Sequence, residues 1–299
     1  MRPTSRVGFT LVEMIAVIAM TGILAAAVAV FLRLPLQAYQ DAQRRASISD
    51  VADSAFALIK RDLQTALPNS VRVTSAGAVS YLEFLETRTG GRYRADSAVP
   101  AAPTTANTCP DTNADGLAEE NALQFGVADT CFTSLGALPR LNTIAANSDF
   151  LVVYNLGPGY PGADAYATGG ATGGNKSRIT AVAAGTGGEN MLRFQAHAFP
   201  LDSPGRRFQV VAGPVSYECD PAAGTIRRVD AYPIAAVQPT PPAGASALVA
   251  NGVTGCSMVY DQSAANRREG VVSIWLRFTD PAGGGVVNLF QQVQVSNVP

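Results

Sequence analysis

Residues 9–32 read FTLVEMIAVIAMTGILAAAVAVFL, an apolar run in which Glu13 carries the single charge. As an α-helix the run would rise about 36 Å, more than the ~30 Å thickness of a bilayer's hydrocarbon core. A core helix of a soluble domain rarely stays apolar on every face over this length. A secretory signal peptide has a shorter apolar region that ends at a cleavage site, whereas good helix formers continue here. The run therefore predicts a membrane-spanning helix.

The chain after this run predicts a second, amphipathic half of the same helix. Apolar side chains recur near helical spacing over 33–67. They are Ile48, Val51, Phe56, Ile59, Leu63 and Leu67. Pro35 should kink the helix at the membrane edge, and Pro68 should end it. We expect one helix over 9–67, in which 9–32 crosses the membrane and 33–67 covers an apolar surface.

Glu13 is costly inside such a membrane helix. A carboxylate there costs roughly 3 kcal/mol on insertion scales, so it normally has a partner. No Lys or Arg lies within one helical turn of Glu13. The side chain must therefore become protonated or find a positive charge outside its own helix.

The residues before the apolar run give this carboxylate a context. Residues 1–8 form a short, basic segment that contains Arg2 and Arg6. Its last residue, Gly8, begins the sequence GFTLVE at 8–13. A basic leader, this hexapeptide and an immediate apolar helix resemble the class III leader and cleavage signature of the type IV pilin and type II secretion pseudopilin superfamily.

The resemblance implies a processing and assembly pathway. A membrane prepilin peptidase would cleave between Gly8 and Phe9, and the new amino group of Phe9 would be N-methylated. Glu13 would pair with the positive amino terminus of a neighbouring subunit when the chain leaves the lipid for a filament. Other major and minor pilins and the inner-membrane assembly platform would be its partners, and membrane lipid would surround it before assembly.

Beyond Pro68 the pattern changes to short β-like runs between Gly- and Pro-rich turns. The candidate strands lie near 70–75, 80–86, 149–155 and 191–196, and within 206–230. The clearest pair, 271–278 and 286–295, flanks DPAGGG and predicts an antiparallel hairpin. Its first strand places Val272, Ile274, Leu276 and Phe278 on one face, which is expected to be the apolar one.

These patterns predict an α+β fold in which the long N-terminal helix packs on a C-terminal antiparallel β-sheet head. We expect one head over 68–299 rather than two domains, because the amphipathic helix needs an apolar sheet to cover. Two segments, 95–121 and 156–176, are rich in small and turn-forming residues and are expected to be loop-like insertions.

The head contains four cysteines, at positions 109, 131, 219 and 256. An exported head would lie in an oxidising compartment, where an even number of cysteines favours disulfides. Of the three possible connectivities we favour the sequence-local pairs Cys109–Cys131 and Cys219–Cys256. A zinc site is the alternative, but the chain has no CxxC spacing.

Several segments of the head resemble the MshO-type minor pilins of MSHA (mannose-sensitive haemagglutinin) pili. They are ALPNSVRV (66–73), DFLVVYNLGPG (149–159), ADAYA (163–167), FPLDSPGRRFQVVAGPVSYEC (199–219) and QVQVSNVP (292–299). The resemblance implies a low-abundance subunit with a single membrane pass and a periplasmic head, which enters a pilus or primes its assembly. A minor pseudopilin of the J type, from type II secretion, shares this plan and stays open as an alternative.

A calcium loop is a further possibility in the first insertion. Asp111, Asn113, Asp115 and Gly116 match the D-x-N-x-D-G opening of such a loop, and oxygen ligands suit this hard cation. Ala122 stands where the bidentate Glu should fall, so a polar turn is the simpler interpretation. No cofactor is required for the predicted role, and a calcium-dependent adhesin head stays open as a second alternative.

Other classes of function lack support in the sequence. Lys and Arg total 22 against 23 Asp and Glu, so overall charge gives no reason to bind nucleic acid. GxSxG, CxxC and HExxH are absent and His197 is the single histidine, so we expect a structural residue there and no enzyme. Trp275 is either a core-edge residue or an interface anchor. The arginine pairs at 206–207, 227–228 and 267–268 are interpreted as solvated strand ends or protein contacts.

Overall fold

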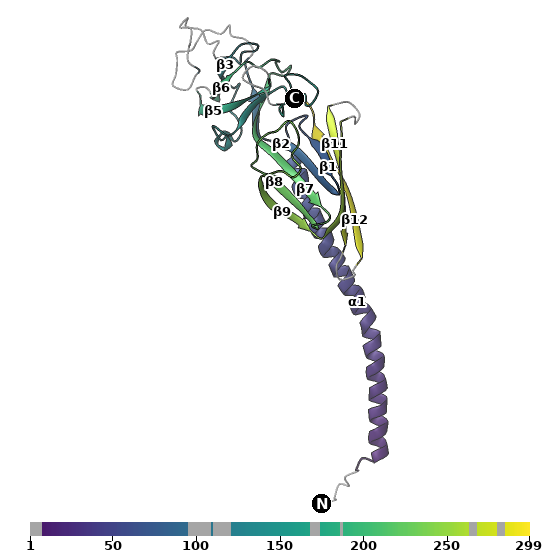
Figure 1. Ribbon diagram of the computed structural model, residues 1–299. Coiled ribbons are helices and arrows are strands. Elements are labelled where there is room, and N and C mark those ends of the chain that lie inside the picture. The colour runs from purple at the N-terminus through teal and green to yellow at the C-terminus, as the bar shows by residue number, and fades with distance from the viewer. Residues whose placement is uncertain are drawn as a thin grey trace, which may run out of the picture.

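The computed structural model describes residues 8–94, 109, 121–167, 174–185, 188–262, 268–279 and 285–299. It shows an α+β chain in which one long helix projects from an antiparallel β-sheet head (Figure 1). The helix, α1, spans Leu11–Leu63 and continues through Pro35 as a single element. The predicted helix and its position before the sheets are confirmed.

The helix ends four residues earlier than the predicted Leu67. Thr65 donates from both its N–H and its Oγ1 to the carbonyl of Asp62, at 2.9 and 2.7 Å, which closes the last turn tightly. The N–H of Leu67 then donates to the carbonyl of Leu85 at 2.8 Å. Leu67 is buried, but against the sheet that it has begun to pair with, so its apolar character does not extend the helix.

The larger sheet runs in the order β1-β2-β7-β4-β5-β6-β3, with β8 pairing to β7 and β9 to β8, and all these pairings are antiparallel. Its strands are β1 (Arg72–Ala76), β2 (Val79–Arg92), β3 (Asp129–Thr133), β4 (Phe150–Val153), β5 (Lys176–Ala184), β6 (Asn190–His197), β7 (Arg207–Asp220), β8 (Thr225–Asp230) and β9 (Ala245–Asn251). A short 3-10 helix, Leu141–Thr143, precedes β4. Strand β7 joins the two ends of the sheet, because its first half pairs with β4 and its second half with β8.

A second sheet contains the predicted C-terminal hairpin. It consists of β10 (Val253–Asp261), β11 (Glu269–Thr279) and β12 (Val286–Ser296), in that order. Val272 of β11 pairs with Val293 of β12, and Phe278 pairs with Val287. The predicted apolar face of β11 is buried, since Val272, Ile274 and Leu276 are fully enclosed. The hairpin and its facing are therefore confirmed.

The main core lies where α1 meets both sheets. Ile59 and Leu63 of α1 pack in one buried cluster with Leu82 of β2, Tyr217 of β7 and Leu276 of β11. Burying each of these large side chains stabilises the fold by about 1.5–3 kcal/mol relative to exposing it. The amphipathic half of α1 thus serves as a central element of the head, as its spacing predicts.

A second core occupies the end of the head far from the free half of α1. Phe132, Leu151, Ile179, Leu192 and Phe208 are buried together there, from strands β3 to β7. Figure 1 shows β3, β5 and β6 at this far end, with the C-terminus at the same end and the N-terminus at the opposite end of the molecule. The chain therefore separates an exposed helix from a distal group of strands and loops.

Candidate functional site

The N-terminal half of α1 makes no core contact with the head. It is long and apolar enough to cross a membrane, and none of its most apolar 18-residue window is buried. Phe9, Leu11 and Phe31 are each more than three-quarters exposed, although they are large and apolar. In water this surface would be strongly unfavourable, so the helix is a candidate membrane anchor.

Gly8, Phe9 and Thr10 precede the helix as exposed chain with no regular secondary structure. A Cβ placed on Gly8 would meet nothing within 4 Å, so the Gly8–Phe9 peptide is open on the side where a side chain would stand. Residues 1–7 of the expected leader lie outside the described residues. The peptide bond expected to be cleaved is thus accessible and lies just outside the helix.

Glu13 occupies the first turn of α1. Its backbone N–H donates to Oγ1 of Thr10 at 3.3 Å, which makes Thr10 the N-cap of the helix. The Glu13 side chain is exposed and has no partner within the described part of the chain. A negative charge here is favoured by the helix dipole and remains available to a partner from another molecule.

Both favoured disulfides are present. Cys109 and Cys131 are bonded with a Cα–Cα distance of 5.7 Å, and Cys219 and Cys256 with 6.5 Å. The second bond joins β7 to β10, and therefore one sheet to the other. Among the described cysteines none is free, so the zinc alternative has no ligands left.

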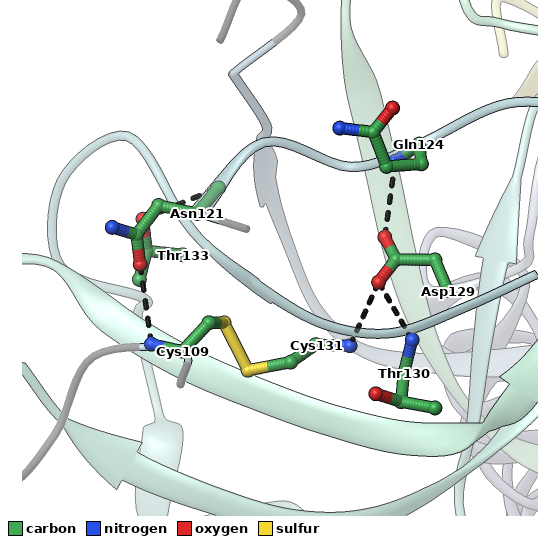
Figure 2. Close-up of a disulfide and its surroundings, with 7 residues drawn as sticks. All are labelled: Cys109, Asn121, Gln124, Asp129, Thr130, Cys131 and Thr133. Carbon is green, nitrogen blue, oxygen red and sulfur yellow. Dashed lines mark hydrogen bonds between the residues drawn. A yellow bond between two sulfur atoms is a disulfide. The ribbon is translucent and has the colours of Figure 1, made fainter. Parts of the chain in front are cut away.

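The Cys109–Cys131 bond lies in a network of hydrogen bonds between side chains and backbone groups (Figure 2). The carboxylate of Asp129 accepts from the N–H groups of Gln124, Thr130 and Cys131 at 2.6–3.2 Å. Burial raises the pKa of Asp129, and the three N–H donors oppose that shift. The Asp129 carboxylate is thus used to hold the turn before β3.

The proposed calcium ligands Asp111, Asn113 and Asp115 lie outside the described residues. Within the described ranges, no group of three or more His, Cys, Asp or Glu side chains is arranged to hold a metal ion. The calcium loop stays a prediction.

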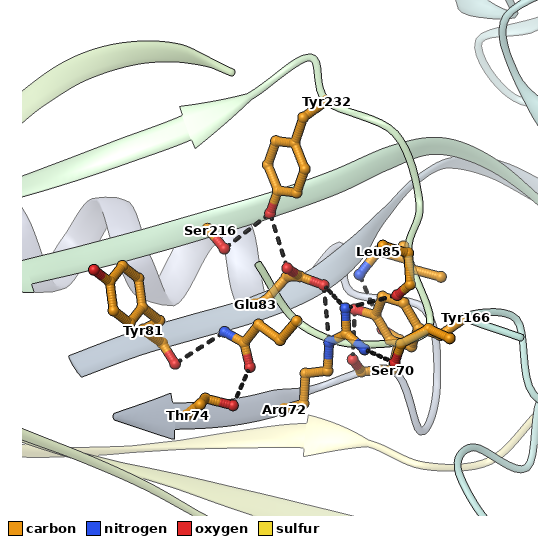
Figure 3. A network of polar contacts seen from close by, with 12 residues as sticks. Ser70, Arg72, Thr74, Tyr81, Glu83, Leu85, Tyr166, Ser216 and Tyr232 are labelled. Atoms are coloured by element: carbon orange, nitrogen blue, oxygen red, sulfur yellow. Dashed lines mark hydrogen bonds and ion pairs between the residues drawn. The ribbon is translucent and has the colours of Figure 1, made fainter. Parts of the chain in front are cut away.

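A buried ion pair that the sequence pattern did not predict joins β1 to β2 (Figure 3). Arg72 donates from Nε and from a terminal nitrogen to Oε1 of Glu83, at 2.9 and 2.6 Å. Tyr232 donates to the other oxygen of Glu83 at 3.1 Å, and the Arg72 guanidinium lies 3.7 Å from the ring centre of Tyr166. Burial raises the pKa of Glu83, against the opposing effect of Arg72.

This network has a positioning role. Arg72 also donates to the carbonyls of Ala235 and Ala236, at 2.9 and 2.8 Å, so it fixes the segment that follows β8. The sequence held only half of the signal for it. Strict alternation places Glu83 on the same face as Tyr81 and Leu85, but it places Arg72 on the face opposite its apolar neighbours.

The two remaining candidate residues from the sequence, His197 and Trp275, have contacts that are typical of structural residues. His197 is buried, with Nε2 at 2.6 Å from the carbonyl of Gly174 and its ring edge-on to Phe199. Trp275 is half-buried on the outer face of the second sheet and pairs across strands with the exposed Phe290. Among the described residues, His197 belongs to no group of three or more His, Cys, Asp or Glu side chains that could hold a metal ion.

The arginine pair at 227–228 departs from its predicted role. Arg227 is exposed, as expected of a solvated strand, but Arg228 turns inward and forms ion pairs with Asp62 and Asp230. Adjacent strand residues face opposite sides of a sheet, so the interpretation of both as solvated or protein-contact residues was wrong for Arg228.

No protein-family model and no curated protein matches the sequence, and no solved structure matches the fold. The function has to be inferred from the residues of this chain.

Proposed function

We propose that this chain is a minor pilin of an MSHA-type type IV pilus. It is stored in the inner membrane with the free half of α1 in the lipid and the head in the periplasm. After cleavage between Gly8 and Phe9 and N-methylation of Phe9, it enters the filament or primes its assembly, with the helix in the filament core. Its partners are the prepilin peptidase, the assembly platform and the other pilins.

One observation carries this proposal: GFTLVE lies at the junction between exposed chain and a bare apolar helix. The scissile peptide lies outside the helix, where a protease needs it, and Glu13 lies inside the first turn. An ordinary membrane anchor needs neither feature, and it gains nothing from a carboxylate in its apolar stretch.

The division of α1 also supports an assembling subunit. From Ile48 to Leu63, α1 packs against the head, and this contact ties the exposed part of the helix to the head. A rigid connection of this kind would hold each head at a fixed place on a filament. The larger sheet exceeds that of a typical pilin head, which favours a specialised subunit over the repeating one.

The test is the mass of the protein purified from membranes of a host that has a prepilin peptidase. We expect loss of residues 1–8 and addition of one methyl group, with Phe9 as the first residue by N-terminal sequencing. The matched control is Gly8→Leu, which adds a side chain at the open position without touching the helix. It should leave the leader attached. A cut after Ala25–Ala29, or an intact Met1 in the wild-type chain, would contradict the proposal.

A further inference from the structure

A groove with a volume of about 1060 Å³ is lined by the C-terminal residues Asn297, Val298 and Pro299. Figure 1 shows the C-terminus at the end of the head away from the free half of α1. The walls of the groove include Tyr154, Tyr160, Arg207, Gln262, Arg268 and Asn297. These residues come from segments far apart in the sequence, so the fold assembles the groove. Its volume is in the range of sites that hold small ligands.

The floor of the groove is rigid. Asn69 donates from Nδ2 to the carbonyls of Asn155 and Asn297, at 2.8 and 3.1 Å. The side chain of Asn297 is buried, and its Oδ1 accepts from the Tyr260 hydroxyl at 3.1 Å. Three separate segments are thus fixed to one another beneath the groove, which would present a preformed surface to a ligand.

Left-handed backbone positions gather around the same groove. Asn69 and Tyr154 line it with φ of 59° and 52°, and Arg206, next to the lining residue Arg207, has φ of 52°. This conformation is unusual for a bulky residue such as Tyr154. Strained backbone of this kind tends to collect at binding sites, where the surrounding structure holds it in place.

Two guanidinium groups give the groove its charge. Arg207 and Arg268 are exposed, and neither side chain has a partner within the described residues. The described residues that line the groove include no Asp or Glu. A guanidinium presents a planar fork of N–H donors that matches a carboxylate in bidentate fashion. The groove therefore favours an anionic ligand over a neutral or cationic one.

The other lining groups favour a saccharide over a peptide. Tyr160 is half exposed and offers a ring face for an apolar sugar face, while the amide of the exposed Gln262 matches hydroxyl groups. A bound peptide commonly adds to a free strand edge or places apolar side chains in deep pockets. This groove is walled mainly by turns and chain ends, and the aliphatic side chains among its described lining residues are Leu156, Val298 and two prolines.

We propose that this groove binds a carboxylate-bearing saccharide, with Arg207 and Arg268 on the carboxylate and Tyr160 against the sugar ring. The site lies at the end of the head that holds the C-terminus, away from the free half of α1. The proposal does not depend on the pilus assignment, because it rests on the head alone.

The test is calorimetric titration of the full chain in detergent with trigalacturonate and, in parallel, with its fully methyl-esterified form. The two probes share their sugars and differ in the carboxylate charge. We expect saturable binding of the acid and at least about tenfold weaker binding of the ester, the effect of losing a charge-assisted hydrogen bond. Arg207→Gln and Arg268→Gln should each weaken binding of the acid by about tenfold.

Matched variants separate the individual contributions. Tyr160→Ala should weaken binding, whereas Tyr160→Phe keeps the ring and should bind as the wild type does. Arg193→Gln removes an exposed arginine from β6, outside the groove, and should leave binding unchanged. The substituted side chains Tyr160, Arg207 and Arg268 are exposed, so all variants should keep the melting temperature of the wild type.

Several outcomes would overturn the proposal. Absence of trigalacturonate binding to the wild type, equal binding of the ester, or full binding by both arginine variants would each do so. Tighter binding of an acetylated tetraglutamate peptide than of trigalacturonate would assign the groove to an acidic peptide instead. If one variant has a lower melting temperature than the wild type, its binding result is set aside. The comparison of the acid and the ester on the wild-type protein then decides.

Discussion

Arg228 of β8 donates from Nε to Oδ2 of Asp62, the penultimate residue of α1, over 2.7 Å. The same carboxylate oxygen accepts from the Tyr217 hydroxyl of β7 at 2.8 Å. The Asp62 side chain is 9% exposed and that of Arg228 is 21% exposed, so water screens the pair only in part. The end of the long helix is thus fixed to two strands by a shared carboxylate, in addition to its apolar contacts.

Arg228→Met should lower the free energy of unfolding by about 2 kcal/mol. Breaking a fully buried pair costs about 3–5 kcal/mol, and the partial exposure of Arg228 reduces that figure. Urea unfolding of the detergent-solubilised chain measures the change. Arg227→Met is the matched control, because Arg227 is the exposed neighbour on the same strand and should change stability by less than about 0.5 kcal/mol. Equal effects of the two variants would show that the Asp62 pair adds nothing.

Alkaline solution should destabilise the head through its buried tyrosines. Burial, and then the Asp62 carboxylate, raise the pKa of Tyr217 far above its ordinary value of 10, and burial with Glu83 does the same for Tyr232. Above pH 10 the folded chain therefore binds more protons than the unfolded chain. The free energy of unfolding should be insensitive to these groups below pH 10 and then fall by about 1.4 kcal/mol per pH unit for each tyrosine.

Tyr217→Phe tests this pH dependence. The variant should show a slope smaller by about 1.4 kcal/mol per pH unit above pH 10, because one proton fewer is released on unfolding. Urea unfolding between pH 8 and pH 11.5 measures both slopes. The surface variant Tyr39→Phe is the control, since Tyr39 is 64% exposed on the free part of α1, and it should keep the wild-type slope. Identical slopes for wild type and Tyr217→Phe would show that Tyr217 is not the source of the alkaline instability.

Removal of the disulfide between the two sheets should be strongly destabilising. Cys219 and Cys256 are 37 residues apart, and closing a loop of that length in the unfolded chain is worth about 4 kcal/mol in the chain-entropy account. The double variant Cys219→Ala/Cys256→Ala should lose an amount of that order in urea unfolding. A loss below about 1 kcal/mol would mean that packing in the main core already holds the sheets together.

The elements that were predicted correctly have strong local signals. The apolar run after Phe9 is too long and too uniformly apolar for a helix of a soluble core, and both strands of the β11–β12 hairpin place most of their aliphatic residues at alternate positions. The two disulfides were predicted because an exported head would lie in an oxidising compartment and because the paired cysteines are close in sequence. The helix end was missed because Leu67 continues the apolar spacing, whereas pairing with Leu85 decides its conformation.

The missed elements depend on tertiary context. Strands β5 and β9 are rich in alanine, which does not favour strands locally, so pairing with the neighbouring strands β4, β6 and β8 decides their conformation. The groove was missed for the same reason, since turns from distant segments form it. By contrast, the candidate site at Gly8, Phe9 and Glu13 lies in one continuous hexapeptide, so sequence alone could locate it.

Glu13 provides the last prediction, which concerns assembly and not folding. The Glu13→Gln variant keeps the shape and hydrogen bonding of the side chain but removes the charge proposed to meet the methylated amine of a neighbouring subunit. Incorporation into filaments should therefore fall, while cleavage after Gly8 and folding of the head persist, because Glu13 has no side-chain partner in the described part of the chain. Subunit abundance in sheared pili, relative to the inner membrane, measures incorporation.

Two comparisons make the Glu13 prediction specific. Glu13→Val should insert into the membrane more easily by roughly 3 kcal/mol, yet it should be incorporated as poorly as Glu13→Gln, because both lack the charge. Glu13→Asp keeps the charge on a shorter side chain and should retain part of the incorporation. If Gln and Val variants enter filaments at wild-type levels, and immunogold labelling finds them along the shaft and not only at the tip, the electrostatic docking account is wrong. A subunit at the tip has no subunit ahead of it, so labelling along the shaft is the observation that decides.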